Sequence, residues 1–248
     1  LSKIYVLESN WRMAHDLIAG FQKVPNELKD YFANLKILSG EKAVDAYNLS
    51  TSSMNVVKET IKFFIEKDNL KRSAEIIDKN WRNLLCFELV ESFMTYKIKN
   101  DKERLKRFKI ISKVLKKYIN EDSNETRFSL AYASYQASIW GEAQNYLDQI
   151  EKDKWDERVV ELYQKINIKT KKPKVISLNA KILPKPLWKC VVCECQYKGW
   201  QLICLNCSSV GTVLWPKSNL KLYKEKDFFK DFLQNPLRHL PQMKREDR

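Results

Sequence analysis

The chain has 248 residues with 44% hydrophobic and 31% charged side chains, a composition that suits one large or two smaller soluble domains with a real core. Only five glycines and seven prolines are present, which argues against an all-β fold with many tight turns. No stretch approaches the length of the apolar run that spans a bilayer. Because residue 1 is leucine rather than methionine, we expect the sequence to be a piece of a longer protein.

The net charge of +14 comes from 45 Lys and Arg against 31 Asp and Glu. Such an excess suits nucleic acid or an acidic membrane surface as a partner. However, the excess is mostly lysine and is spread along the chain. The densest basic region, residues 97–117, also carries Asp101 and Glu103. We therefore expect its charges to surround a solvated helix rather than to line a nucleic-acid groove.

Residues 1–168 show apolar side chains at helical spacing, interrupted by short polar breaks. Pro25 and the Ser39-Gly40 turn mark two of these breaks. The predicted helices cover residues 11–24, 25–38, 41–49, 55–66, 71–80, 83–98, 102–118, 125–139, 142–151 and 157–168.

Ala43, Ala74, Phe108 and Ala143 occupy the same place in the second helix of successive helix pairs, at intervals of 31, 34 and 35 residues. A period near 34 with a small residue where two helices cross is typical of tetratricopeptide (TPR) repeats, in which each pair buries its apolar face by stacking on the next. Phe108 departs from this pattern, and the proline that often ends a repeat is absent. An irregular helical bundle is the alternative.

Residues 169–187 form a proline- and lysine-rich linker, semi-extended by its prolines, that we expect to lie against the last repeat through Val175, Ile176, Leu178 and Ile182. After residue 216 the pattern predicts a short helix over 224–233, with Phe228, Phe229 and Phe232 on one side, and a charged tail to residue 248.

Residues 188–216 hold two Cys-x-x-Cys pairs, Cys190/Cys193 and Cys204/Cys207, separated by ten residues. Two such turns facing each other supply the closed tetrahedral set of four thiolates that Zn²⁺ prefers, with no open coordination position. The spacing predicts a small zinc-ribbon or rubredoxin-like β module with a structural zinc ion, and iron is the minority option for the same ligands.

Two disulfides are the alternative for these four cysteines, although nothing resembles a secreted disulfide scaffold. Cys195 can compete as a ligand, but the matching spacing of the two pairs favours Cys193 and leaves Cys195 as a spare thiol. Cys86 is isolated in an apolar run and fits a small buried side chain. Trp188, Trp200 and Trp215 frame the motif, and we expect their rings to pack in a core.

Catalytic patterns are missing from the sequence. The two histidines, His15 and His239, have no evident partner motif, and no glycine-rich phosphate loop, nucleophile elbow or His-Glu-x-x-His sequence is present. A fully metallated set of four thiolates supplies neither a base nor a reactive cysteine. We therefore expect no catalytic residues, no bound organic cofactor and no enzyme activity.

Residues 129–147, SLAYASYQASIWGEAQNYL, resemble the last repeat of the proteobacterial HemY family, the membrane-anchored TPR proteins associated with haem biosynthesis. The order W-x-C-x-x-C, W-x-x-x-C-x-x-C, W in residues 188–215 is similar to the C-terminal ribbon of its alphaproteobacterial members. The layout is also similar to that of LapB, the metal-binding TPR family of lipopolysaccharide assembly. The resemblance is specific over about residues 127–215. Glu194 and Ser208 replace the glycine often found after each Cys pair.

This resemblance implies an N-terminal pair of transmembrane helices outside the present sequence. It also implies a cytoplasmic repeat domain that organises or regulates late tetrapyrrole enzymes, with Cys190, Cys193, Cys204 and Cys207 as metal ligands.

The prediction is thus an all-α TPR-like solenoid followed by a small zinc ribbon, acting as a non-catalytic scaffold. It would bind protein partners through its concave face, at the cytoplasmic face of the bacterial inner membrane. One alternative is a nucleic-acid-binding ribbon protein, favoured by the charge and the aromatic rings. Another is a rubredoxin-like redox or regulatory module, as in LapB-type envelope assembly proteins.

Overall fold

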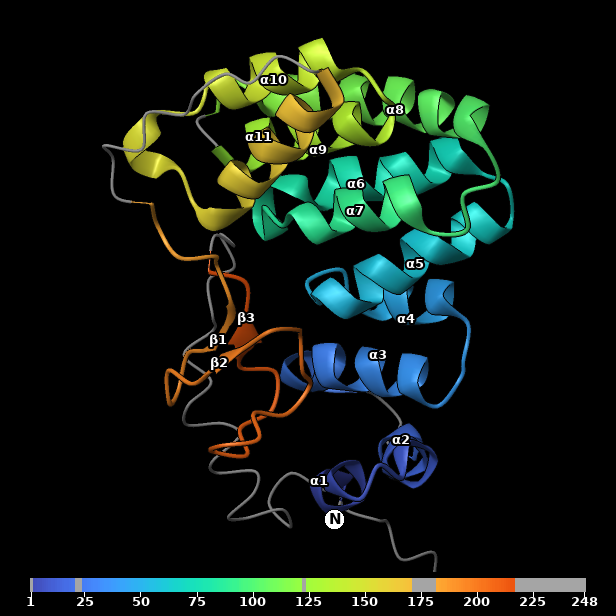
Figure 1. The fold of residues 1–248 in the computed structure, drawn as a ribbon. Helices are drawn as coiled ribbons and strands as arrows, with labels where there is room; N and C mark the ends of the chain where they lie inside the picture. The colour runs from blue at the N-terminus through green and yellow to red at the C-terminus, as the bar shows by residue number, and fades with distance from the viewer. Residues whose placement is uncertain (1, 21–23, 122–123, 171–181, 217–248) are drawn as a thin grey trace, which may run out of the picture.

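The computed structural model describes residues 2–20, 24–121, 124–170 and 182–216, and within these ranges the chain forms eleven α-helices and three short strands (Figure 1). The helices are α1 Ser2–Leu7, α2 Trp11–Ala19, α3 Lys29–Leu38, α4 Ala43–Leu49, α5 Met54–Glu66, α6 Leu70–Leu84, α7 Phe87–Thr95, α8 Asp101–Leu115, α9 Asn124–Gln136, α10 Trp140–Asp148 and α11 Glu157–Thr170. None of the helices in these ranges has both the length and the apolar character needed to cross a membrane.

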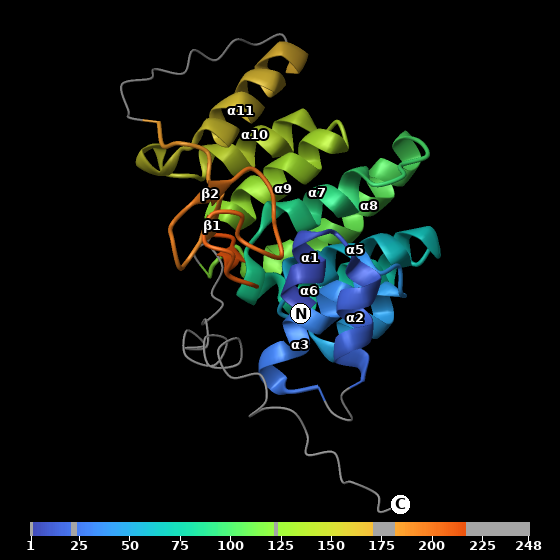
Figure 2. The same ribbon diagram turned by 90° about the horizontal axis from the view of Figure 1, so that it is seen from below.

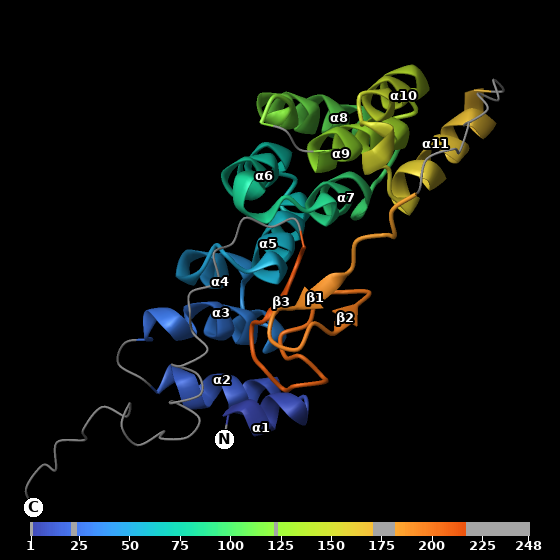
Figure 3. The ribbon, with the colours of Figure 1, turned by 90° about the vertical axis from the view of Figure 1, so that its left-hand side faces the viewer.

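The helices form five consecutive hairpins, from α1/α2 to α9/α10, and α11 follows the last one. Neighbouring hairpins contact each other in order: the odd-numbered helices α3, α5, α7 and α9 pack successively, and α6 packs on α8. Figure 3 shows the result as a stepped stack with α1 and α2 at one end and α10 and α11 at the other. The mostly helical fold predicted from the sequence is confirmed.

The same turn recurs between the two helices of each hairpin. Its central residue has a positive φ in all five cases: Ser9, Gly40, Asp68, Lys97 and Ser138. In four of them the next N–H group donates back across the turn, as from Asn69 to the carbonyl of Phe64 over 2.8 Å. This pattern ends the first helix with a Schellman-type cap and sends the chain back along it.

Side chains also begin the second helix of some hairpins. The side-chain oxygen of Asn10 accepts from the N–H of Met13, and Asn69 accepts in the same way from Arg72. These N-caps fix the starts of α2 and α6.

The positions that carry the 34-residue period are all buried in the second helices. Ala43 begins α4 and is 8% exposed, Ala74 in α6 is 2% exposed, and Ala143 in α10 is fully buried. Phe108 takes the equivalent place in α8 and is also buried. A larger side chain is thus accommodated where α8 packs on α6.

Helix α1 is the element that the sequence pattern did not predict. It has only six residues, and among its described side chains Val6 alone is buried, which leaves too little periodicity to detect. Most other helices lie within a few residues of their predicted bounds, and the predicted 102–118 helix ends at Leu115 and continues as a 3₁₀ turn to Tyr118. The predicted helix at 224–233, the charged tail with His239, and the linker contacts of Val175, Ile176 and Leu178 lie outside the described residues.

The three strands belong to the cysteine-containing segment. β1 (Trp188–Cys190) is central and pairs antiparallel with β2 (Gln196–Tyr197) and β3 (Val213–Leu214). This small sheet lies beside the odd-numbered helices (Figure 3). It shares one hydrophobic core with α5 to α11 through Trp188, Cys190, Cys204, Val213 and Trp215. The ribbon therefore runs along the side of the stack that the odd-numbered helices line.

Candidate metal centre

The first Cys pair stands on a tight turn that follows β1. The N–H of Glu194 donates to the carbonyl of Cys190, and the N–H of Cys190 donates to the carbonyl of Cys195, each over 2.9 Å. Glu194 has a φ of 62°, the left-handed conformation that glycine adopts most readily. This turn brings the thiols of Cys190 and Cys193 to the same side.

The second Cys pair repeats the geometry of the first. The N–H of Ser208 donates to the carbonyl of Cys204, and the N–H of Cys204 donates to the carbonyl of Ser209, each over 2.8 Å. Ser208 has a φ of 56°. Glu194 and Ser208 therefore adopt the backbone conformation of the glycine that the sequence lacks at both places.

The four sulfur atoms of the two turns lie within 4.8 Å of one another. Cys190 Sγ is 3.7 Å from Cys207 Sγ, and Cys193 Sγ is 3.4 Å from Cys204 Sγ. A tetrahedral zinc ion with Zn–S bonds of about 2.3 Å places its sulfur ligands about 3.8 Å apart. The donor type, number and spacing thus fit a metal ion such as zinc, and the four cysteines predicted from the sequence come together.

Neither of the other two cysteines belongs to this group. Cys195 closes the first turn through its carbonyl oxygen, and its thiol is not one of the four clustered sulfurs. Cys86 is fully buried between α6 and α7, where burial raises the pKa of its thiol well above the ordinary value. It fills space in the core, as the sequence indicated.

Hydroxyl groups surround the sulfur atoms. Tyr197 Oη lies 3.0 Å from Cys204 Sγ, Thr212 Oγ1 lies 3.3 Å from Cys190 Sγ, and Ser209 Oγ lies 3.2 Å from Cys207 Sγ. Although burial opposes it, hydrogen bonding from Tyr197 and nearby backbone N–H groups lowers the pKa of Cys204 to about 6. The protein thus stabilises a thiolate at this position, and a thiolate is the form that binds metal.

The positive φ at Ser208 leads to a small but specific prediction. We expect Ser208→Gly to stabilise the metal-loaded ribbon by about 0.5–1 kcal/mol, because glycine adopts this conformation without the Cβ clash that serine suffers. Denaturant unfolding followed by tryptophan fluorescence measures the change. Ser208→Ala is the control: it removes the hydroxyl but keeps the Cβ, so it should bring no gain.

The ribbon is joined to the middle of the helical stack through its first tryptophan. Trp188 Nε1 donates to Glu88 Oε1 over 2.8 Å, and Glu88 Oε2 lies 3.1 Å from Lys58 Nζ. The rings of Trp188 and Trp215 are 5.5 Å apart and both are buried. These two rings therefore pack in the core, as expected, and connect the sheet to α5 and α7.

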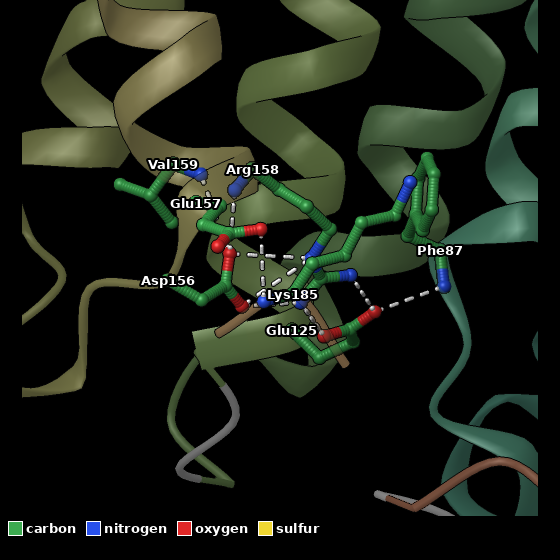
Figure 4. A network of polar contacts seen from close by, with 7 residues as sticks. All are labelled: Phe87, Glu125, Asp156, Glu157, Arg158, Val159 and Lys185. Carbon is green, nitrogen blue, oxygen red and sulfur yellow. Dashed lines mark hydrogen bonds and ion pairs between the residues drawn. The ribbon is translucent and has the colours of Figure 1, made fainter. Parts of the chain in front are cut away.

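Figure 4 shows a buried ionic network around Arg158. Arg158 donates to both carboxylate oxygens of Glu125 over 3.0 and 2.9 Å and to Asp156 Oδ2 over 2.8 Å. Its guanidinium carbon is 4.6 Å from the centre of the Phe128 ring and 5.7 Å from that of Trp215. Glu125 also accepts from the N–H of Phe87 over 3.1 Å. The network links α7, α9 and α11 where the ribbon meets them.

The described end of the linker is attached to the start of α11. The N–H of Leu183 donates to the carbonyl of Trp155 over 2.8 Å, and the N–H of Glu157 donates to the carbonyl of Leu183 over 3.1 Å. The N–H of Lys185 donates to the Glu157 carboxylate. Ile182 packs against the core, which is the one predicted linker contact that lies within the described residues.

The other side of the ribbon reaches the opposite end of the stack. Leu202 and Ile203, next to the second Cys pair, share a buried cluster with α1, α2 and α3 that contains Val6, Ala14, Ile18, Tyr31, Phe32 and Leu35. Trp200 and Val210 pack at its edge. The ribbon therefore contacts the first helices through this cluster and contacts α11, after the last hairpin, through Trp215 and Arg158.

Of the two histidines, only His15 lies in the described part of the chain. Its ring stacks on Phe32 at 5.0 Å, and its nitrogens lie 3.0 Å from Asp16 and 2.8 Å from Glu41. Packing on Phe32 and contacts with two carboxylates account for this side chain.

No protein-family model matches the chain, and no curated protein matches its sequence.

Proposed function

We propose that this chain is a non-catalytic helical-repeat scaffold with a ribbon that folds around one zinc ion. The ribbon packs on the odd-numbered helices and stabilises that side of the repeats. The observation that carries the proposal is the closed set of four thiols on two matching turns. Four thiolates fill a tetrahedral zinc site and leave no position for a substrate, so the ion would supply folding energy.

Two features support a TPR-like character for the helical part. The first is the turn that recurs between the helices of each hairpin. The second is the burial of Ala43, Ala74 and Ala143 at one register in alternate helices. Stacked hairpins of this kind present long surfaces suited to other proteins.

The ribbon changes which surface is open to a partner. Because it covers part of the side lined by the odd-numbered helices, a protein ligand on that side would meet the ribbon as well as the helices (Figure 3). The loops between the paired cysteines expose Val191, Val192 and Leu205, and Leu205 is 70% exposed. These apolar tips are suitable contacts for a protein partner.

The resemblance of residues 127–215 to HemY-type proteins suggests the class of partner. On that basis we propose enzymes of late tetrapyrrole synthesis as the first proteins to test. Co-purification of such enzymes with the intact chain, and their loss with Leu205→Glu, would support this choice. Equal recovery of these enzymes with the intact chain and with Leu205→Glu would oppose it.

Elemental analysis of anaerobically purified protein tests the metal centre. We expect about one zinc per chain, and a native thiol count in which Cys195 reacts while Cys86 reacts only after unfolding. Iron with visible colour would favour electron transfer instead. Absence of metal together with thiols lost in pairs would show that the two turns hold disulfides.

A further inference from the structure

Helix α8 has one face made entirely of lysine. Lys102, Lys106, Lys109 and Lys113 are exposed, and on a helix of 3.6 residues per turn they fall within an arc of about 60°; Lys116 and Lys117 are also exposed and lie in the 3₁₀ turn that follows. The buried residues of the helix, among them Phe108, Ile111 and Leu115, lie on the opposite side. Asp101, Glu103 and Arg104 lie outside the arc, so charge does surround this helix, as expected, but one of its faces carries lysine alone.

Two of these six lysines have an acidic partner. Lys116 lies 3.5 Å from Glu142, and Lys117 forms an ion pair with Asp78. Within the described residues, Lys102, Lys106, Lys109 and Lys113 form neither an ion pair nor a side-chain hydrogen bond. We call these four the lysine stripe. It spans about 17 Å along the helix axis.

Such a row is unfavourable for the helix itself. Like charges three or four residues apart repel each other, and the opposite charge that usually relieves them is missing here. The stripe therefore produces a concentrated positive potential at the expense of helix stability.

We propose that the lysine stripe binds the surface of an anionic lipid bilayer. Figures 1, 2 and 3 show α8 on the far side of the stack from the ribbon, so the stripe is available while the ribbon contacts other proteins. A straight row of ammonium groups on an outward face matches a planar array of lipid phosphates. Clusters of four to eight basic residues on a helix are typical of such binding.

A nucleic acid fits this surface less well. Helix α8 packs against α6, α7 and α9, so it cannot enter a major groove as an inserted helix would. The stripe contains no aromatic ring for base stacking and no arginine for bidentate contacts to bases or phosphates. The exposed apolar side chain beside the stripe is Leu105, which can enter the headgroup region.

Vesicle flotation with the full chain tests the proposal. At physiological ionic strength we expect binding to mixed phosphatidylcholine–phosphatidylglycerol vesicles and none to phosphatidylcholine alone. Replacing all four stripe lysines by glutamine should weaken binding on the order of a hundredfold or more, from about fivefold per charge near the surface. The matched control has the same net charge and replaces four exposed lysines elsewhere that form no ion pair with any residue the structure describes: Lys42, Lys152, Lys165 and Lys169 to glutamine.

The outcomes separate the stripe from bulk charge. Loss with the stripe variant and near-normal binding with the control would support the proposal. Equal loss in both variants, or no binding by the unmodified chain, would overturn it. A mobility-shift titration with duplex and single-stranded nucleic acid runs in parallel. If the chain binds nucleic acid more tightly than vesicles, and the same four substitutions abolish that binding, the proposal would be overturned in favour of nucleic acid.

Discussion

Cys204→Ser is expected to remove the metal ion and, with it, the protection of α1, α2 and α3 against hydrogen exchange, while most of the helical signal remains. Cys204 is one of four clustered thiols, and binding of a structural zinc ion contributes on the order of 10 kcal/mol in small zinc modules. Without the metal, a sheet with strands of two and three residues is too small to persist.

The first three helices are affected because the ribbon covers them. Leu202 and Ile203 lie two residues or fewer from Cys204 and pack into the cluster of Val6, Tyr31 and Phe32. Losing the ribbon exposes that apolar surface to water. The later hairpins keep their own contacts with each other.

Hydrogen exchange measured by mass spectrometry reports the protection of each helix. Far-ultraviolet circular dichroism reports how much of the total helical content remains. Cys195→Ser is the matched control, because it removes a thiol from the same segment without touching the four clustered sulfurs. Unchanged protection of α1 to α3 in Cys204→Ser would contradict a bracing role. Loss of the whole helical fold would contradict a helical stack that is stable by itself.

Arg158→Met should destabilise the protein by about 3–5 kcal/mol, the usual loss when one partner is removed from a buried ionic network. Arg158 and Glu125 are almost completely buried, and methionine would leave the carboxylates of Glu125 and Asp156 without their cation. The change should also loosen Trp215, whose ring lies beside the guanidinium.

Denaturant unfolding monitored by circular dichroism and by tryptophan fluorescence measures the effect. Arg72→Met is the control: its guanidinium pairs with Glu75 on the surface of α6, and both side chains are more than 40% exposed. Exposed pairs of this kind contribute at most about 0.5 kcal/mol. A loss below 1 kcal/mol for Arg158→Met would show that the buried network does not stabilise the fold.

Local patterns in the sequence predicted most of the helical part and the cysteine group. Apolar spacing located α5 and α9 to within a few residues because their buried faces repeat every three or four positions. The two Cys-x-x-Cys pairs indicated the four clustered thiols because each turn brings its two sulfurs together by itself.

Contacts between distant parts of the chain could not be predicted in the same way. Trp188 and Glu88 are 100 residues apart, and nothing local shows that they form a hydrogen bond. Arg158 looks like an ordinary surface residue of a helix start, and its burial depends on Glu125 and Phe128 from α9. The lysine stripe was detectable, because placing each charge on a helical projection separates the lysines from Asp101 and Glu103.

The contact between the ribbon and the first helices also concerns synthesis of the chain. Tyr31 and Phe32 leave the ribosome before Leu202 and Ile203, which cover them and follow about 170 residues later. At 5–20 residues per second this interval is about 8–34 s. During that time the apolar surface of α1 to α3 is open to chaperones and to other nascent chains. Synthesis and folding of the ribbon is therefore the step that ends this exposure.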